Sequence, residues 1–307
     1  MKFVLAWLLS FPLTCAADQY SHPFSPKPLG ILLLYEGSDP LWETTVDAIR
    51  RKLSLQYPVK AAAGLADRKE LQNGVDALKA ERVQKIVAVP LFLYSHSEIM
   101  DQNRFLLGLN PKAAKEHAQE ARYKMGFSSA KPIQNKLPLA MTKALDDHSI
   151  LGDILTTRAK SLSRNSARET VLLIGSPPHS KEDRQHWEST VNALAEQVKR
   201  KGGFQTVAAE ALPINLKQAE REKAEGALRQ KIRSLRSGSP VIVVPMELTR
   251  GEIGARIPKA LNGLFIRYDG KPALPDGRII AWAQAAAQEG AGLPDMRVKK
   301  PLKLIQN

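Results

Sequence analysis

The sequence contains one eight-residue pattern twice, and this repeat constrains the fold more than any other feature. Trp42–Ile49 reads WETTVDAI, and Trp187–Leu194, which begins 145 positions later, reads WESTVNAL. The apolar segments around the pattern also recur in the same order, so the repeat covers a whole unit of the chain. A period far above the roughly 50 residues of a solenoid repeat indicates two tandem copies of one domain.

Each copy alternates continuous apolar runs with amphipathic stretches. A helix is predicted from Pro40 and another over 68–82. The predicted strands are 30–35, 59–65 and 85–93 in the first copy and 170–175, 206–212 and 240–245 in the second. Buried apolar strands that alternate with helices are typical of a parallel sheet with crossover helices. We therefore predict an α/β fold of two tandem domains, with ligands bound where the polar strand ends meet.

The ends of the chain differ in composition from the repeated units. Lys2 and the apolar stretch Phe3–Leu13, followed by small residues, predict an export signal. The apolar stretch is shorter than the ~20 residues of a membrane-spanning helix, so we expect a periplasmic or secreted protein without a stable membrane span after cleavage. The expected parts are a signal peptide (1–17), a linker (18–28), the first unit (29–148), a closing helix with its connection (149–168), the second unit (169–290) and a basic tail (291–307).

Composition narrows the classes of partner. The net charge of +14 suits nucleic acid, an anionic membrane surface or a polycarboxylate ligand. Lys and Arg are scattered without interleaved aromatic residues, so we expect no nucleic-acid binding. Cys15, the single cysteine, lies in the predicted signal, which leaves no disulfide or thiolate metal site afterwards. The glycine-rich and Gly-x-Ser-x-Gly motifs of dinucleotide, nucleotide and α/β-hydrolase sites do not occur.

Two segments of the first copy resemble a known family. Val89–Glu98 reads VPLFLYSHSE and Ala144–Leu151 reads ALDDHSIL. Both are similar to segments of the class II chelatases of the sirohydrochlorin cobaltochelatase and ferrochelatase-like type, and the agreement in element order spans about residues 30 to 285. The resemblance implies two tandem chelatase-like (flavodoxin-like) domains. It also implies a lyase that inserts Co²⁺, Fe²⁺ or Ni²⁺ into sirohydrochlorin or a related polycarboxylate tetrapyrrole, with no organic cofactor.

The turns that carry histidines in that family differ here. Glu36 stands at the first turn of the first copy, and Glu98 stands at the later one, two positions beyond His96. In the second copy Ser176 takes the first-turn position, and the segment Met246–Glu252 contains no histidine. We therefore expect the second copy to be degenerate as a metal site and any chemistry to belong to the first.

The first copy still offers the residue types that metal insertion needs. Imidazole binds Co²⁺, Fe²⁺ and Ni²⁺, and a carboxylate serves as a ligand or as the base that accepts pyrrole protons. We predict a metal site of His96, Glu36 and Glu98, in which His96 and Glu36 are also catalytic. Each residue has a structural alternative: a hydrogen-bonded surface turn for His96, a helix-start acid for Glu36, and a solvated acid opening the next helix for Glu98.

Other polar residues at the strand ends are candidates for binding the substrate. Arginines that follow a strand end are able to pair with ligand carboxylates, although solvated arginines are the more common case. The predicted substrate-binding residues are Ser38, Ser95, Ser97, Arg250 and Arg256.

A second group of possible ligands lies in the second copy. His179, Glu182, Asp183 and His186 have the spacing that places them on one face of a continuous helix. The simpler alternative is an ordinary helix start, because acids favour a first helical turn.

These patterns leave more than one function open. The first hypothesis is a chelatase, and the second is a non-catalytic exported protein that binds a metal ion or a tetrapyrrole. Replacement of the turn histidines favours the second hypothesis, whereas retention of Val89–Glu98 argues against a scaffold with an empty cleft.

Overall fold

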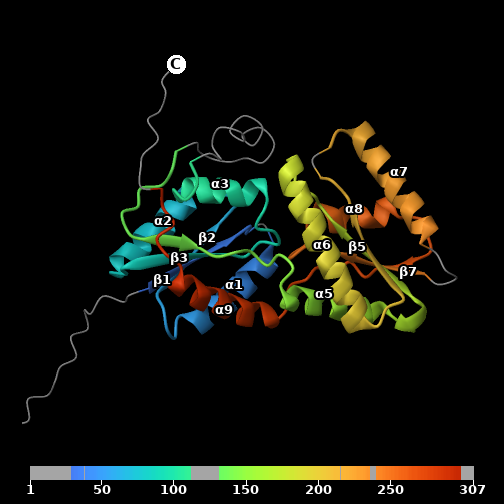
Figure 1. Ribbon diagram of the computed structural model, residues 1–307, viewed down its shortest axis with the longest axis horizontal. Helices are drawn as coiled ribbons and strands as arrows, with labels where there is room; N and C mark the ends of the chain where they lie inside the picture. Colours follow the sequence, from blue (N-terminus) through green and yellow to red (C-terminus); the bar gives the residue numbers. More distant parts are fainter. Residues whose placement is uncertain (1–28, 38, 112–130, 215, 236–239, 299–307) are drawn as a thin grey trace, which may run out of the picture.

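The computed structural model describes residues 29–37, 39–111, 131–214, 216–235 and 240–298 (Figure 1). The predicted signal peptide and linker, Ser38 and residues 299–307 of the predicted tail lie outside this part of the chain. Within the described residues, no helix is both long and apolar enough to cross a membrane.

Two four-stranded parallel sheets form the centre of the two units. The first has the order β2-β1-β3-β4 and the second the order β6-β5-β7-β8. The strands are β1 (Leu29–Tyr35), β2 (Val59–Ala63), β3 (Lys85–Pro90), β4 (Leu139–Met141), β5 (Thr170–Gly175), β6 (Thr206–Ala211), β7 (Val241–Pro245) and β8 (Ile266–Arg267). The identical strand order confirms the duplicated α/β architecture. The sequence patterns predicted three strands of each sheet and missed β4 and β8, which are too short to show a periodicity.

Helices connect successive strands and cover the sheets. α1 begins at Pro40 because the Asp39 carboxylate caps it, accepting a hydrogen bond from the Leu41 N–H at 2.8 Å. The helices are α1 (Pro40–Leu53), α2 (Arg68–Ala80), α3 (Glu98–Leu106), α5 (Ser149–Leu162), α6 (Lys181–Gly202), α7 (Gln218–Ser234), α8 (Glu252–Ala260) and α9 (Arg278–Gly292).

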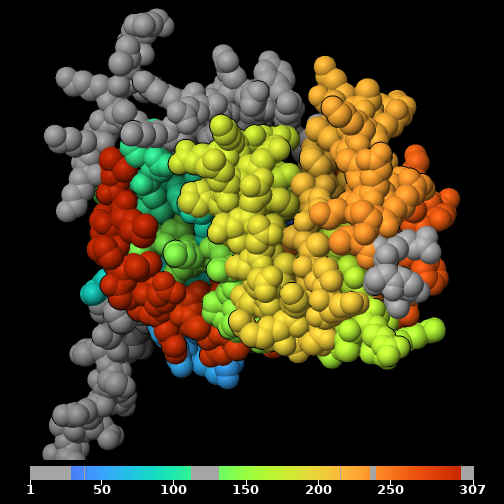
Figure 2. Space-filling model, turned by 45° about the vertical axis from the view of Figure 1, so that its right-hand side comes forward, coloured from blue at the N-terminus to red at the C-terminus, as the bar shows by residue number. Residues whose placement is uncertain are grey.

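The two units exchange their closing helices. α5 follows the first sheet in sequence but packs against α6 and β7 of the second unit. α9 follows the second sheet but packs against α1 and β3, and Figure 2 shows its red atoms on the flank of the first unit. The close approach of α9 needs Gly290, because a Cβ there would lie 2.2 Å from Val87 Cγ1. The division into units by sequence therefore differs from the division by packing.

The residues after α9 also return to the first unit. Lys85 Nζ donates hydrogen bonds to the carbonyl oxygens of Ala291 at 2.8 Å and Leu293 at 2.5 Å. The Asp295 carboxylate accepts from the Leu139 N–H at 3.0 Å. The described start of the predicted basic tail thus lies along β4.

Strand residues alternate between different cores. Ile31 and Leu33 face a core that also contains Leu173 of the second sheet, whereas Leu32 and Leu34 face a core of the first unit alone. The exchanged helices complete the shared core, so the two sheets and the cleft between them are held in one packed structure.

Candidate functional site at the cleft between the two units

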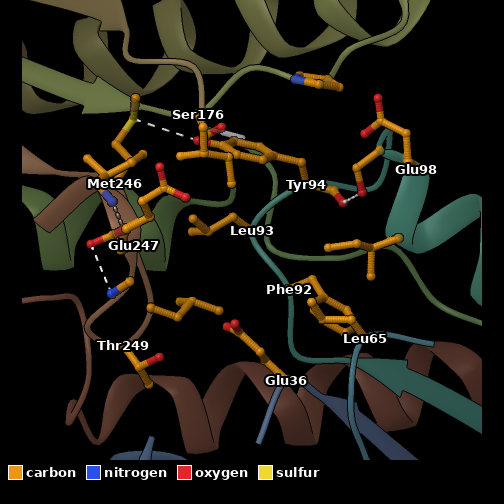
Figure 3. Close-up of a pocket in the computed structure, with 18 of the residues that line it drawn as sticks. Glu36, Leu65, Phe92, Leu93, Tyr94, Glu98, Ser176, Met246, Glu247 and Thr249 are labelled. Carbon is orange, nitrogen blue, oxygen red and sulfur yellow. Dashed lines mark hydrogen bonds between the residues drawn. The ribbon is translucent and has the colours of Figure 1, made fainter. Parts of the chain in front are cut away.

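A cavity of about 490 Å³ lies where the carboxyl ends of the two sheets face each other (Figure 3). β1 ends just before Glu36, and β3 continues into Leu91–Tyr94. In the second unit β5 ends just before Ser176, and β7 continues into Met246–Thr249. All of these strand ends line the cavity, which is the position where open parallel sheets bind ligands.

Glu247 is the most constrained carboxylate of the cavity. It accepts hydrogen bonds from the backbone N–H groups of Ile253 at 2.8 Å and Gly254 at 2.9 Å, in the first turn of α8. Gly251 and Gly254 make this contact possible, since a Cβ at either position would lie 2.5 or 2.8 Å from a Glu247 carboxylate oxygen. Burial, together with the nearby charge of Glu36, raises the pKa of Glu247, although the backbone N–H groups oppose this change.

Glu36 lies on another wall of the same cavity (Figure 3). Its side chain is half-buried, and no described residue donates a hydrogen bond to it. Of the predicted site residues, Glu36 therefore has a carboxylate that is directed at the cleft and is not engaged by another described residue. Glu36 and Glu247 come from different units, so the cleft is lined by both copies rather than by the first alone.

Glu98 lines the cavity but is already engaged by the other unit. It is the first residue of α3, is 8% exposed, and accepts hydrogen bonds from the N–H groups of His179 at 2.5 Å and Ser180 at 3.2 Å. These N–H groups lie at the amino end of α6, where a negative charge is stabilised. Glu98 thus joins α3 to α6. It opens the next helix, as the structural alternative expected, but it is buried rather than solvated.

His96 lies apart from the cavity. Its ring stacks on that of His186 from α6, with centroids 3.8 Å apart and an angle of 13° between the planes. Burial, followed by the neighbouring His186 and Arg104, lowers the pKa of His96. His96, Glu36 and Glu98 therefore do not meet, and no group of three or more His, Cys, Asp or Glu residues in the described part of the chain is placed to hold a metal ion.

The predicted serines have mainly structural contacts. The N–H and hydroxyl groups of Ser95 both donate to the Asp146 carboxylate, at 2.7 and 2.6 Å, and its Oγ accepts from the Ala144 N–H. Ser97 lines the cavity and caps α3 by accepting from the Met100 N–H at 3.4 Å. Ser38 lies outside the described residues.

Neither predicted arginine lines the cavity. The Arg256 guanidinium pairs with Glu225 of α7 at 3.0 Å and donates to the Pro213 carbonyl at 2.6 Å. Arg250 is exposed, and its backbone N–H donates to the Asp39 carboxylate at 3.3 Å. Arg256 is therefore occupied by protein partners, which corrects its predicted role in binding the substrate.

The group of possible ligands in the second unit is an ordinary helix start. Ser180 caps α6 by accepting a hydrogen bond from the Asp183 N–H at 3.0 Å. His179 lines the cavity, whereas His186 faces His96. These side chains form no cluster among the described residues that is placed to hold a metal ion.

Sequence reasoning missed Glu247 as a site residue. The family resemblance points to a histidine after the strand that ends at Pro245, whereas this chain has a glutamate two positions after Pro245. The spacing of Gly251 and Gly254 at the start of α8 was the available signal, because two glycines there allow a close contact with the helix backbone.

Together, the duplicated parallel sheets and the cleft at their facing ends define a chelatase-like α/β fold. No model of a known protein family matches the sequence, and no curated protein matches it. Comparison with solved structures shows that the chain is structurally similar to class II chelatases over most of its length, at low sequence identity.

Three of the similar solved structures are two of SirB and one of a larger protein. SirB from Bacillus subtilis with Fe³⁺ has a TM-score of 0.59 and 14% identity, and the match covers 86% of this chain and 96% of SirB. The sirohydrochlorin chelatase SirB from Bacillus subtilis subspecies spizizenii in complex with cobalt has a TM-score of 0.55 and 14% identity, with 86% and 95% covered. A multi-domain protein from Deinococcus radiodurans with structural similarity to chelatases has a TM-score of 0.53 and 16% identity, with 88% and 57% covered.

Proposed function

We propose that this protein is chelatase-like in activity as well as in fold, and that the cleft binds a tetrapyrrole into which a divalent metal ion is inserted. The observation that carries this proposal is the cavity of about 490 Å³ at the facing strand ends, lined by carboxylates from both units. This volume is in the range of small-molecule sites. The cobalt and iron in the SirB structures make Co²⁺ and Fe²⁺ the first metals to test, with Ni²⁺ as a third.

Metal insertion releases two protons from the pyrrole nitrogens as the metal–nitrogen bonds form. Glu36 and Glu247 are the proposed proton acceptors, because both line the cleft and neither is paired with a cationic side chain among the described residues. The raised pKa of Glu247 suits this role, since a base works best when its pKa approaches the working pH. Each carboxylate then returns its proton to water.

The direct test is absorbance spectroscopy of purified protein with Co²⁺ and, in separate reactions, sirohydrochlorin or a water-soluble porphyrin without peripheral carboxylates. We expect a metal-dependent spectral change faster than the uncatalysed reaction with at least one of the two macrocycles, slowed about 100-fold or more in Glu247→Gln because a positioned base is lost. Glu196→Gln, which makes the same change on the exposed surface of α6, is the control and should react like the original protein. No change above the uncatalysed rate with either macrocycle would remove the enzymatic proposal.

The second candidate function is binding of a metal ion or tetrapyrrole without turnover. It is favoured by the residues that stand where the resembling family has turn histidines, Glu36 and Glu98 in the first unit and Ser176 in the second. Calorimetric titration with Co²⁺ or Ni²⁺ tests it in the original protein and in His96→Ala. Because His96 lies outside the cavity lining, we expect its replacement to leave the affinity unchanged, and a loss of binding would restore His96 as a ligand.

We further propose that the protein is exported, on the basis of the pattern in residues 1–17. Amino-terminal sequencing of protein recovered from cell fractions tests this. A mature chain that begins near residue 18 in an exported fraction is the expected result.

A further inference from the structure

The cleft has a charge opposite to that of the whole chain. Four glutamates line it, Glu36, Glu98, Glu247 and Glu252, and no Lys or Arg does so in the described part of the chain. The chain as a whole carries a net charge of +14. Solvent-exposed charges act over a Debye length of about 8 Å at physiological ionic strength, so the carboxylates at the cleft dominate there over distant surface cations.

Neighbouring groups neutralise the negative charge of these four glutamates only in part. Glu98 faces the N–H groups at the start of α6, and Glu247 faces those at the start of α8. Glu252 lies 3.7 Å from Arg256, which is itself paired more closely with Glu225. Glu36 has no cationic partner among the described residues. Among the described residues, the side chains that line the cleft therefore carry a net negative charge.

Most of the other residues that line the cleft are apolar, and the polar exceptions are Ser97, Ser176, His179 and Thr249. The side chains of Leu65, Leu93, Ile99 and Ile214 line the cavity and are only partly buried, although most other large aliphatic residues of the sheets are fully buried. They come from both units and surround the carboxylates, as Figure 3 shows for Leu65, Leu93 and Glu36. A partly exposed apolar wall around a few polar groups is typical of a site for a small, largely apolar ligand.

Building on the proposed function, we infer that the cleft selects a tetrapyrrole with an apolar or cationic periphery and discriminates against polycarboxylate macrocycles such as sirohydrochlorin. A macrocycle with several carboxylates would bring like charges beside Glu36 and Glu247 without a Lys or Arg in the described lining to pair with them. An apolar rim would instead cover Leu65, Leu93, Ile99 and Ile214. This differs from the substrate class that the family resemblance implies.

The test compares two water-soluble porphyrins of similar size, one with peripheral carboxylates and one with peripheral N-methylpyridinium groups. Binding of each is followed through its Soret absorbance, beside sirohydrochlorin. We expect the cationic porphyrin to bind at least about tenfold more tightly, a difference that one partly screened charge interaction is able to supply. Added salt should narrow this difference.

Variants distinguish the cleft from the rest of the surface. Glu36→Gln, which breaks no hydrogen bond among the described residues, should strengthen binding of the carboxylate porphyrin several-fold and weaken that of the cationic one. Glu196→Gln on the surface of α6 should leave the affinities for both porphyrins unchanged. Tighter binding of the carboxylate porphyrin, or equal effects of the two variants, would overturn the inference while leaving tetrapyrrole binding in place. If none of the three macrocycles binds, the proposed function fails as well.

Discussion

At the scale of single residues, the cleft depends on how Glu247 is held. Its carboxylate is positioned by backbone N–H groups at the start of α8 rather than by a side-chain cation. This arrangement fixes the position of the carboxylate. The partial positive charges of the N–H groups offset its negative charge only in part. The arrangement requires Gly254, because a side chain there would occupy the space of the carboxylate.

We predict that Gly254→Ala disturbs this contact. The added Cβ would lie 2.8 Å from Glu247 Oε2, so the carboxylate or the first turn of α8 must move. The expected loss in the free energy of unfolding is about 1–3 kcal/mol, the usual cost of overpacking. Gly226→Ala in α7 is the matched control, because nothing lies within 4 Å of its Cβ. The control should gain about 0.4–1 kcal/mol. Equal stability of the two variants in urea unfolding would contradict this account.

The order of strand ends and polar residues predicted part of the cavity lining. Glu36 and Ser97 line the cavity as strand-end reasoning predicted, since the carboxyl ends of parallel strands gather at one edge. His96 was misplaced because a turn of several residues follows β3 and turns its ring toward α6. A sequence does not reveal which way such a turn directs each side chain.

At the scale of elements, a buried ion pair ties three segments of the second unit together. Glu169, which precedes β5 and is 2% exposed, accepts hydrogen bonds from Arg267 of β8 at 2.6 Å and from Ser163 after α5 at 2.5 Å. Burial acts to raise the pKa of Glu169, but these hydrogen bonds outweigh it and lower the pKa to about 2. The short strand β8 is therefore held by a side chain as well as by its pairing with β7.

Because of this ion pair, we predict that the free energy of unfolding falls when the pH is lowered. The carboxyl of Glu169 titrates near 4.5 when unfolded and near 2 when folded, so its stabilisation is complete above pH 4.5 and is lost as the pH falls toward 2. Glu169→Gln should lower the free energy of unfolding by about 2–3 kcal/mol at neutral pH and flatten its pH dependence over this window. Urea unfolding between pH 2 and 7 measures this. An unchanged slope in the variant would refute the role of the pair.

The sequence largely predicted the order of the helices and strands, but it did not predict which sheet each helix packs against. The apolar runs of β1, β3, β5 and β7 are long enough to identify as buried strands. The exchange of α5 and α9 left no sign in the sequence, because each helix shows an apolar face without indicating which sheet it covers. β8 consists of two residues and depends on neighbours distant in sequence.

At the scale of the whole molecule, the exchanged helices make two similar units interdependent. The shared core contains Trp42 of the first unit and Trp187 of the second. Removing either sheet would expose a helix contributed by the other half of the chain. The cleft between the sheets is consequently fixed by the fold rather than by a flexible linker.

We predict that the two units unfold together. In the chain without residues 1–17, fluorescence of Trp42 is isolated by Trp187→Phe with Trp282→Phe, and fluorescence of Trp187 by Trp42→Phe with Trp282→Phe. Each should change at the same urea concentration as the far-UV circular dichroism of that variant, since one core contains both tryptophans. Trp282 also lies in this core, and its fluorescence, isolated by Trp42→Phe with Trp187→Phe, should give the same midpoint. Separate transitions would show that the units are independent.

The central claim is that the cleft between the units is the binding site for a tetrapyrrole, and a titration with a blocked cleft tests it most directly. Leu65→Trp places an indole in the cavity, whereas Leu55→Trp adds the same ring at a position that is 77% exposed. We predict that the cationic porphyrin shifts its Soret band equally with the original protein and with Leu55→Trp, and binds at least about tenfold more weakly to Leu65→Trp. Equal binding to all three proteins would contradict the account.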